Sequence, residues 1–213
     1  MFWRQSWRLW REQAGSYFWV ACFIFVAFFA AGAGAAVSYP DLAENIFGII
    51  AQNFADKGLL DAEPVAQAWI IFANNLTVSA FLLVFGFIPL LFLPYIIIGL
   101  NGLTAGLVIA AAPMPESGGR FLFAAAGLLP HGIFELPALF IAASLGSYCC
   151  ACLTGGLMSK LRSKAAKPEK LRLGARETAL FTVKIFLLLV LPLLFVAAVA
   201  EIWLTPLVMK AVL

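Results

Sequence analysis

The sequence has few charged residues and only one histidine. Charged side chains make up 12% of its 213 residues and hydrophobic side chains 63%, whereas a soluble domain is about 25% charged and about 45–50% apolar. One soluble core cannot bury so much apolar surface, so we expect a lipid bilayer to surround most of the chain. The sequence also lacks a phosphate-binding loop, a dinucleotide fingerprint and a G-x-S-x-G motif, which excludes the nucleotide-binding and serine-hydrolase sites that these motifs mark.

Four apolar stretches are long enough to cross a bilayer, which takes about 20 residues per helix. They cover residues 17–37, 68–112, 121–158 and 179–201. Apolar residues run through each stretch without the period-two alternation of membrane-barrel strands. We therefore predict an all-α fold, a polytopic membrane helical bundle in which residues 1–213 form a single membrane domain.

Basic residues are concentrated in two segments, and acidic residues in a third. Residues 1–16 contain three arginines, residues 159–178 contain seven lysines and arginines, and residues 38–67 contain five acidic residues and one lysine. Lysine and arginine are enriched in cytoplasmic loops, so we expect the first two segments in the cytoplasm and the third outside. The net charge of +3 then reflects this asymmetry and indicates no nucleic-acid partner.

Two cytoplasmic segments require an even number of crossings between them, which gives five spans in total. We predict transmembrane helices at 17–37, 68–88, 89–112, 138–158 and 179–201. The N-terminus would then be cytoplasmic and the C-terminus external, in the cytoplasmic (inner) membrane.

Residues 121–137 remain, and their two prolines predict a broken backbone. We expect a re-entrant half-helix over 121–129 that enters from the outer face, followed by a turn from Pro130 to Pro137. Nine helical residues reach about 14 Å, which is roughly half of a hydrocarbon core. One long, strongly tilted helix that is kinked at Pro130 or Pro137 is the alternative.

Two further segments have the pattern of helices that lie on a membrane surface. Residues 40–61, within the external segment, carry apolar residues at helical spacing with acidic and amide residues off that stripe. In residues 1–16, three tryptophans alternate with arginines, which is typical of an interfacial helix. The small residues Ala33-Gly34-Ala35 also fit a signal-peptide cleavage site, but we expect an uncleaved first span.

The histidine lies in the apolar run L-L-P-H-G-I-F-E-L-P, four residues before a glutamate. His131 and Glu135 would share one helix face, and ionisable residues at membrane depth indicate function. The pair is our candidate for proton transfer or catalysis, although a structural hydrogen bond explains it equally well. A zinc site needs three or four ligands, so we expect no metal and no cofactor. Pro130, Gly132 and Pro137 form the structural motif around the pair.

Amides and glycines occur in the second and third predicted spans. Asn74, Asn75 and Asn101 are expected either to hydrogen-bond between helices or to join the histidine–glutamate pair in one polar pocket. Gly102 and Gly106 form a GxxxG that marks close helix contact. We expect them to let a second copy approach in a homodimer, or to serve a contact within one chain.

Three of the four cysteines form a C-C-x-C cluster at Cys149, Cys150 and Cys152. Such thiols could hold a soft metal. We favour the reading that they are small buried hydrophobic residues.

Three motifs carry a resemblance to a known family. The run H-G-I-F-E-L-P-A-L-F-I-A-A-S-L-G at 131–146, with F-A-N-N-L at 72–76 and G-L-N-G-L-T-A-G at 99–106, resembles the stage II sporulation protein M family. The resemblance implies five spans and a cytoplasmic N-terminus, and it brings no established catalytic activity. In spore formers the named member acts with peptidoglycan-degrading partners during engulfment of the forespore.

From these patterns we expect a scaffold or accessory subunit in cell-envelope or peptidoglycan remodelling. Its expected partners are the lipid bilayer, a second copy of the chain and other cell-envelope membrane proteins. We do not expect enzymatic activity. The alternative is a transporter, a channel or a membrane-embedded enzyme that uses His131 and Glu135.

Overall fold

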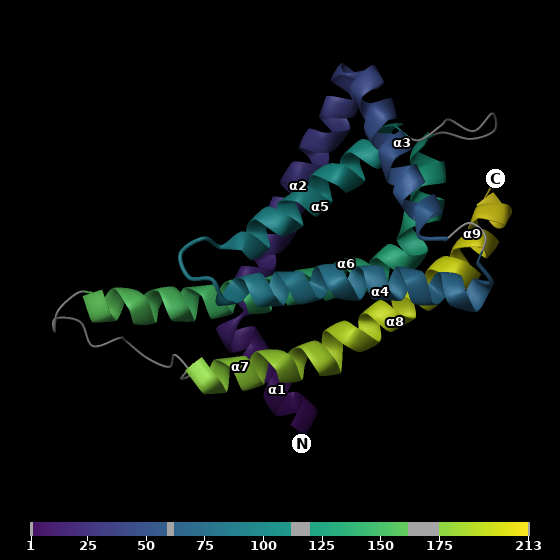
Figure 1. Cartoon of the computed structure of the whole chain (residues 1–213). Helices are drawn as coiled ribbons and strands as arrows, with labels where there is room; N and C mark the ends of the chain where they lie inside the picture. The colour runs from purple at the N-terminus through teal and green to yellow at the C-terminus, as the bar shows by residue number, and fades with distance from the viewer. Residues whose placement is uncertain (1, 59–61, 112–119, 162–174, 213) are drawn as a thin grey trace.

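The computed structural model describes residues 2–58, 62–111, 120–161 and 175–212, and all regular secondary structure in these residues is helical. The elements in chain order (Figure 1) are α1 (Phe2–Gln13), α2 (Gly15–Ser38), α3 (Pro40–Asp56), α4 (Pro64–Val84), the 3₁₀ turn η1 (Phe85–Phe87), α5 (Leu93–Ala111), α6 (Arg120–Leu161), α7 (Ala175–Ile185), the π-helical turn η2 (Phe186–Val190), α8 (Leu191–Val199), the π-helical turn η3 (Ala200–Leu204) and α9 (Thr205–Val212).

Within these residues, five segments are long and apolar enough to cross a membrane. They are Gly15–Ser38, Pro64–Phe87, Leu93–Ala111, Gly132–Met158 and Arg176–Ala211. The predicted class, an all-α membrane helical bundle with five such helices, is confirmed.

Prolines determine where two of the helices begin. Pro40 and Pro64 occupy the first turns of α3 and α4, where a missing backbone N–H costs nothing. Tyr39 precedes Pro40 and has the non-helical angles φ −132° and ψ 71°, because a following proline disfavours the helical region. The chain therefore leaves the direction of α2 at this residue and continues as α3.

Helices α2 and α5 run side by side in the same direction and touch through glycines. A Cβ atom at Gly102 or Gly106 would overlap the backbone of Phe25 or Phe29, respectively, and Gly32 of α2 meets the α5 backbone in the same way. Hydrogen in place of a side chain lets two backbones approach this closely. The glycines for which we expected close helix contact make that contact within one chain.

Helix α6 is the most buried of the five spans. Its glycine Gly146 lies against the backbone of Leu82 and against Gly86, at the end of the α4 span. The Cys150 thiol donates to the carbonyl oxygen of Ile88 at 3.3 Å. These contacts advance together along both segments, so α4 and α6 also run in the same direction.

The turn that we predicted from Pro130 to Pro137 is wrong, because α6 is helical through both prolines. The alternative, one long kinked helix, describes the structure: Figure 1 shows the first part of α6 bent away from its long second part. Each proline removes one backbone hydrogen bond and kinks a helix without ending it. Two prolines seven residues apart lie on nearly the same face, so both kinks bend the helix in the same sense.

The last span is a nearly continuous helical rod that is wider at two places. The π-helical turns η2 and η3 immediately precede the turns that contain Pro192 and Pro206. A π-helical turn rearranges the backbone hydrogen bonds at the point where a proline cannot donate one. The rod continues to α9, well beyond residue 201, where the hydropathy pattern placed its end.

The rod runs against the direction of α6. Cys149 of α6 faces Thr182 near the start of the rod, with the two side-chain atoms 3.2 Å apart. Gly127, near the start of α6, faces Met209 at the far end of the rod. Helix α5 also runs against α6, because Pro94 meets Gly146 whereas Asn101 shares a cavity with Glu135. The directions of α2, α4, α5, α6 and the rod thus alternate along the chain as five successive crossings require.

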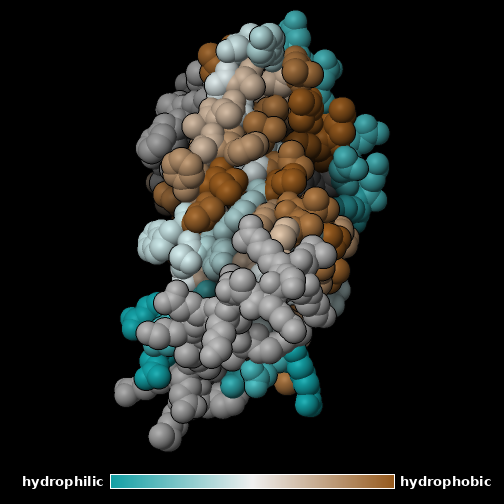
Figure 2. Space-filling model, turned by 90° about the vertical axis from the view of Figure 1, so that its left-hand side faces the viewer, coloured by the Kyte–Doolittle hydropathy of each residue, from teal (hydrophilic) through white to brown (hydrophobic). Residues whose placement is uncertain are grey.

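The outer surface is strongly apolar. Figure 2 shows broad hydrophobic areas on one face, with hydrophilic residues at their margins. Large side chains such as Trp19, Phe23 and Val65 are more than two-thirds exposed. Soluble monomers rarely expose apolar areas of this extent, and a bilayer accommodates them.

Candidate functional site

Helices α2, α5 and α6 line a half-open cavity of about 140 Å³ that brings together two of the predicted polar residues. Asn101 of α5 and Glu135 of α6 both line it. The remaining lining residues are Phe25, Phe29, Ala105, Gly132, Leu136 and Leu139. The site therefore combines one carboxylate and one amide with hydrocarbon and aromatic walls.

The glycine contact between α2 and α5 explains how Asn101 reaches this cavity. Gly102 faces α2, and Asn101, one residue earlier, is rotated about 100° around the helix, where it faces the cavity next to α6. Its Nδ2 donates to the carbonyl oxygen of Ile97 at 2.9 Å. This bond uses one of the two N–H groups of the amide.

Glu135 is half-buried and lies two residues before Pro137, in the bent part of α6. Gly132 is on the same wall, and a Cβ atom added to it would meet no atom within 4 Å. Gly132 therefore widens the cavity at this point. His131 lies in α6 one turn before Glu135, but its side chain is outside the described residues, so the pairing of the two side chains stays a prediction.

The two other predicted amides belong to a different polar group. Asn74 and Asn75, in the middle of α4, hydrogen-bond to each other at 3.4 Å. The ammonium group of Lys57, directly after α3, donates to Asn74 Oδ1 at 2.7 Å. Neither asparagine is among the residues that line the Glu135 cavity. Of our two alternatives for these amides, the Lys57–Asn74 bond fits hydrogen bonding between elements.

Lys57 was not anticipated from the sequence, because a single lysine among the acidic residues of 38–67 carries no pattern. Its bond ties the end of α3 to a point ten residues into α4. A helix rises about 1.5 Å per residue, so Asn74 lies about 15 Å along α4 from its first residue. The end of α3 therefore lies beside the middle of α4. Figure 1 shows α3 descending to α4 in this way.

The amphipathic helix α1 bonds to α6 through Trp10 and Gln13, and the Gln13 side-chain oxygen accepts from the Tyr148 hydroxyl at 3.2 Å. Trp10 is buried, and its Nε1 donates to Ser144 Oγ of α6 at 3.2 Å. Its ring stacks with that of Trp7, at a centroid distance of 4.8 Å. The same helix keeps Arg8 and Arg11 exposed, so α1 has one face bound to the protein and one basic face.

The cysteines contact different neighbours and do not converge. Cys149 faces Thr182 of α7, whereas Cys150 donates to the backbone between α4 and α5. All four cysteines are free thiols. Among the described residues, no group of three or more His, Cys, Asp or Glu side chains could hold a metal ion.

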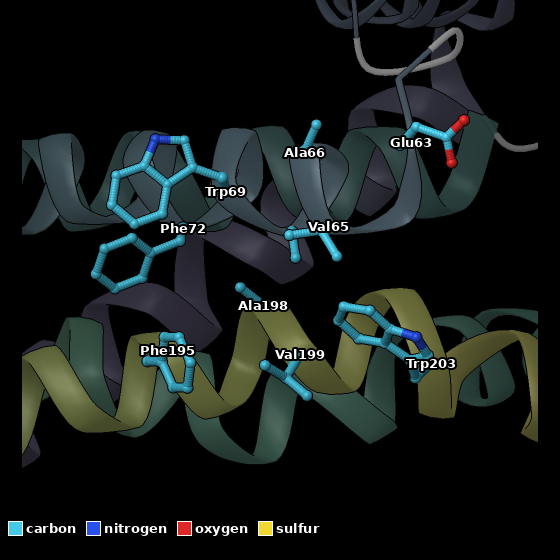
Figure 3. Close-up of a pocket in the computed structure, with 10 residues that line it drawn as sticks. Glu63, Val65, Ala66, Trp69, Phe72, Phe195, Ala198, Val199 and Trp203 are labelled. Carbon is cyan, nitrogen blue, oxygen red and sulfur yellow. The ribbon is translucent and has the colours of Figure 1, made fainter.

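A larger groove of about 540 Å³ lies between α4 and the α8–η3 part of the last span. Figure 3 shows Val65 and Trp69 of α4 on one wall, with Phe195 and Trp203 on the other. Apart from Glu63 at one end, its lining side chains are hydrocarbon or aromatic. No single motif predicted this groove, because it is formed by residues more than 100 positions apart in the sequence.

Five apolar helices, polar contacts between them and a lipid-compatible surface define a polytopic helical membrane protein. The family profile described as Stage II sporulation protein M matches residues 19–206. The chain therefore belongs to the stage II sporulation protein M family. Searches of curated proteins and of solved structures gave no match.

Proposed function

We propose that this protein is a scaffold or accessory subunit of the cytoplasmic membrane that acts in cell-envelope or peptidoglycan remodelling. The observation that carries the proposal is the small size of the polar cavity at Glu135. Small-molecule sites usually measure about 300–1,000 Å³, whereas this cavity measures about 140 Å³. It has room for a few waters but not for a typical substrate.

The polar contacts inside the bundle also support a structural role. Trp10 with Ser144, Cys149 with Thr182, and Lys57 with Asn74 each join two elements. Such bonds position helices and exclude alternative packings. A rigid bundle of this kind can present its exposed surfaces to partner proteins of the cell envelope.

The second candidate function is a proton- or cation-handling site, and one observation favours it. Glu135 and Asn101 line the same cavity within the membrane-spanning region. Carboxylates at membrane depth are costly, and where they persist they often mark ion or proton pathways. In this case the cavity would hold a small cation or water and not an organic substrate.

Glu135→Gln separates the two candidates because it keeps the shape of the side chain and removes its charge. In a strain that lacks the gene, the scaffold role predicts that the variant restores cell-envelope function as well as wild type does. Glu44→Gln, at an exposed position on α3, is the matched control. Loss of complementation by a Glu135→Gln protein that folds normally would contradict the scaffold and support the cation site.

The proposed topology places the N-terminus in the cytoplasm and the C-terminus outside. The basic segment 159–178 supports this orientation by the enrichment of lysine and arginine in cytoplasmic loops. The alternating directions of the five spans fit the same arrangement.

We further propose that the protein forms a homodimer. Gly102 and Gly106 are used within the chain, so the interface would involve other exposed apolar residues, such as Trp19 and Phe23 on α2. A particle mass in detergent of twice the 23.0 kDa of one chain, after correction for detergent, would support the dimer. A mass of one chain at all concentrations would contradict it.

A further inference from the structure

The groove between α4 and α8 is a slot that runs along the helices and narrows at one end. At the narrow end, the rings of Phe72 and Phe195 meet edge to face at a centroid distance of 6.1 Å. At the other end lie Glu63 and Trp203 (Figure 3). Glu63 and Phe72 are nine residues apart, which corresponds to about 13 Å along α4.

Small residues make this slot hollow. Ala68 of α4 and Ala198 of α8 line it where larger residues would fill the space. Figure 3 shows Val65 and Ala198 directed toward each other across the gap. The space in the slot therefore comes from the small side chains at these positions and not from a wide separation of the two helices.

The slot opens toward the lipid of the bilayer. Both walls belong to segments that can span a membrane, and the side chains along its rim are open to the outside: Val65 is 72% exposed and Phe195 56%. The open end coincides with the end of the α4 span, since Glu63 directly precedes Pro64. Tryptophan at this level, as at Trp203, is typical of the lipid headgroup region.

We propose that the slot binds one acyl chain of a phospholipid whose headgroup carries a primary ammonium. The chain lies between α4 and α8 with its tail toward Phe72 and Phe195. The ammonium group lies at the open end, where it donates to the carboxylate of Glu63. A charge-assisted bond of this type requires N–H donors, which a choline headgroup lacks.

Size and charge favour this lipid over a helix of another protein and over an anionic lipid. A helix about 10 Å wide and 13 Å long fills about 1,000 Å³, roughly twice the volume of the slot at about 540 Å³. An anionic lipid would place its charge beside the Glu63 carboxylate. Lipid tails already surround the protein, so transfer into the slot brings no hydrophobic gain. Selectivity therefore depends on fit and on the headgroup contact.

The test is lipid retention by the full-length protein. The protein is incorporated into vesicles with equal parts of phosphatidylethanolamine, phosphatidylcholine and phosphatidylglycerol, extracted with mild detergent and weighed by native mass spectrometry. We expect one retained phosphatidylethanolamine per chain, with an enrichment of about twofold to fivefold from one exposed ion pair.

Two variants locate the retained lipid. Ala68→Leu, on the face of α4 that carries Val65 and Phe72, fills the slot and should abolish retention, whereas Ala27→Leu, at an exposed position on α2 outside the slot, should not. Glu63→Gln should keep one lipid but lose the preference for ethanolamine, and Asp41→Asn, an exposed acid on α3, should keep it.

The headgroup variant does not alter the packing of α4, so it remains informative even if Ala68→Leu folds poorly. Equal retention by wild type and Ala68→Leu would overturn the proposal. A preference for phosphatidylglycerol, or a polypeptide in place of the lipid, would overturn it as well.

Discussion

Replacing Gly106 with alanine tests the closest contact between α2 and α5. The added Cβ would overlap the backbone carbonyl of Phe29. A backbone atom cannot move aside as the end of a flexible side chain can, so the two helices must separate. We therefore expect Gly106→Ala to destabilise the protein, even though alanine favours a helix more than glycine does.

The size of the effect follows from two opposing contributions. Overpacking a well-packed contact costs about 1–3 kcal/mol, and the helix preference of alanine over glycine returns about 1 kcal/mol. Gly34, on the partner helix α2, is the control position, because a Cβ there would meet no atom within 4 Å. Gly34→Ala receives only the favourable contribution, so the two variants should differ in unfolding free energy by about 1–3 kcal/mol.

The measurement is reversible unfolding of the two variants by added denaturing detergent, followed by tryptophan fluorescence. The comparison between the variants cancels the intrinsic preference for alanine and leaves the packing cost. Equal midpoints for Gly106→Ala and Gly34→Ala would refute the glycine-mediated contact. They would also leave Gly106 available for contact with a second copy.

The remaining predictions concern two hydrogen bonds. Trp10→Phe and Ser144→Ala should each lower the unfolding free energy by about 0.5–1.5 kcal/mol. The double variant should lose less than the sum of the two single losses, because both remove the same bond at 3.2 Å. Additive losses would argue against that bond. Thr154→Val removes the acceptor of the Leu90 N–H, bonded at 2.8 Å, and should cost about 0.5–1.5 kcal/mol because this bond is exposed. Thr104→Val, exposed on α5, should be near neutral in the same assay, and equal effects of the two would contradict the role of Thr154.

The role of Thr154 is linked to unusual backbone between α4 and α5. Leu90 and Phe92 have positive φ angles of 75° and 45°, a conformation that costs a side-chain-bearing residue about 1–3 kcal/mol. Two bonds from α6 hold this turn, one from Thr154 and one from Cys150. Sequence alone placed the boundary between two predicted spans at residues 88 and 89 but gave no indication that α6 stabilises the turn.

Hydropathy predicted the class of fold because the bilayer imposes a simple rule. About 20 apolar residues in a row must form a helix when no water is present to satisfy the backbone. That rule located the helices but not their packing. It also misjudged 121–137, where Pro130 and Pro137 indicated a turn although membrane helices tolerate prolines as kinks.

The candidate site was only partly predictable for a related reason. Asn101 and Glu135 were identified as polar residues in apolar surroundings, and the structure places both on one cavity. The same reasoning grouped Asn74 with them, but its partner is Lys57, and nothing in the sequence specifies which faces of α4 and α5 meet. The long groove at Trp69 was not predicted, because it depends on the distance between two helices.

The measurement that tests the account most directly is the sidedness of the chain in intact cells. Five crossings with a cytoplasmic N-terminus predict that a membrane-impermeant thiol reagent labels Asp56→Cys, and a cysteine appended after Leu213, from outside. Ala165→Cys should be labelled only after the membrane is permeabilised. Labelling of Ala165→Cys in intact cells would contradict the five-span arrangement and with it the proposal that α6 crosses the membrane once as a bent helix.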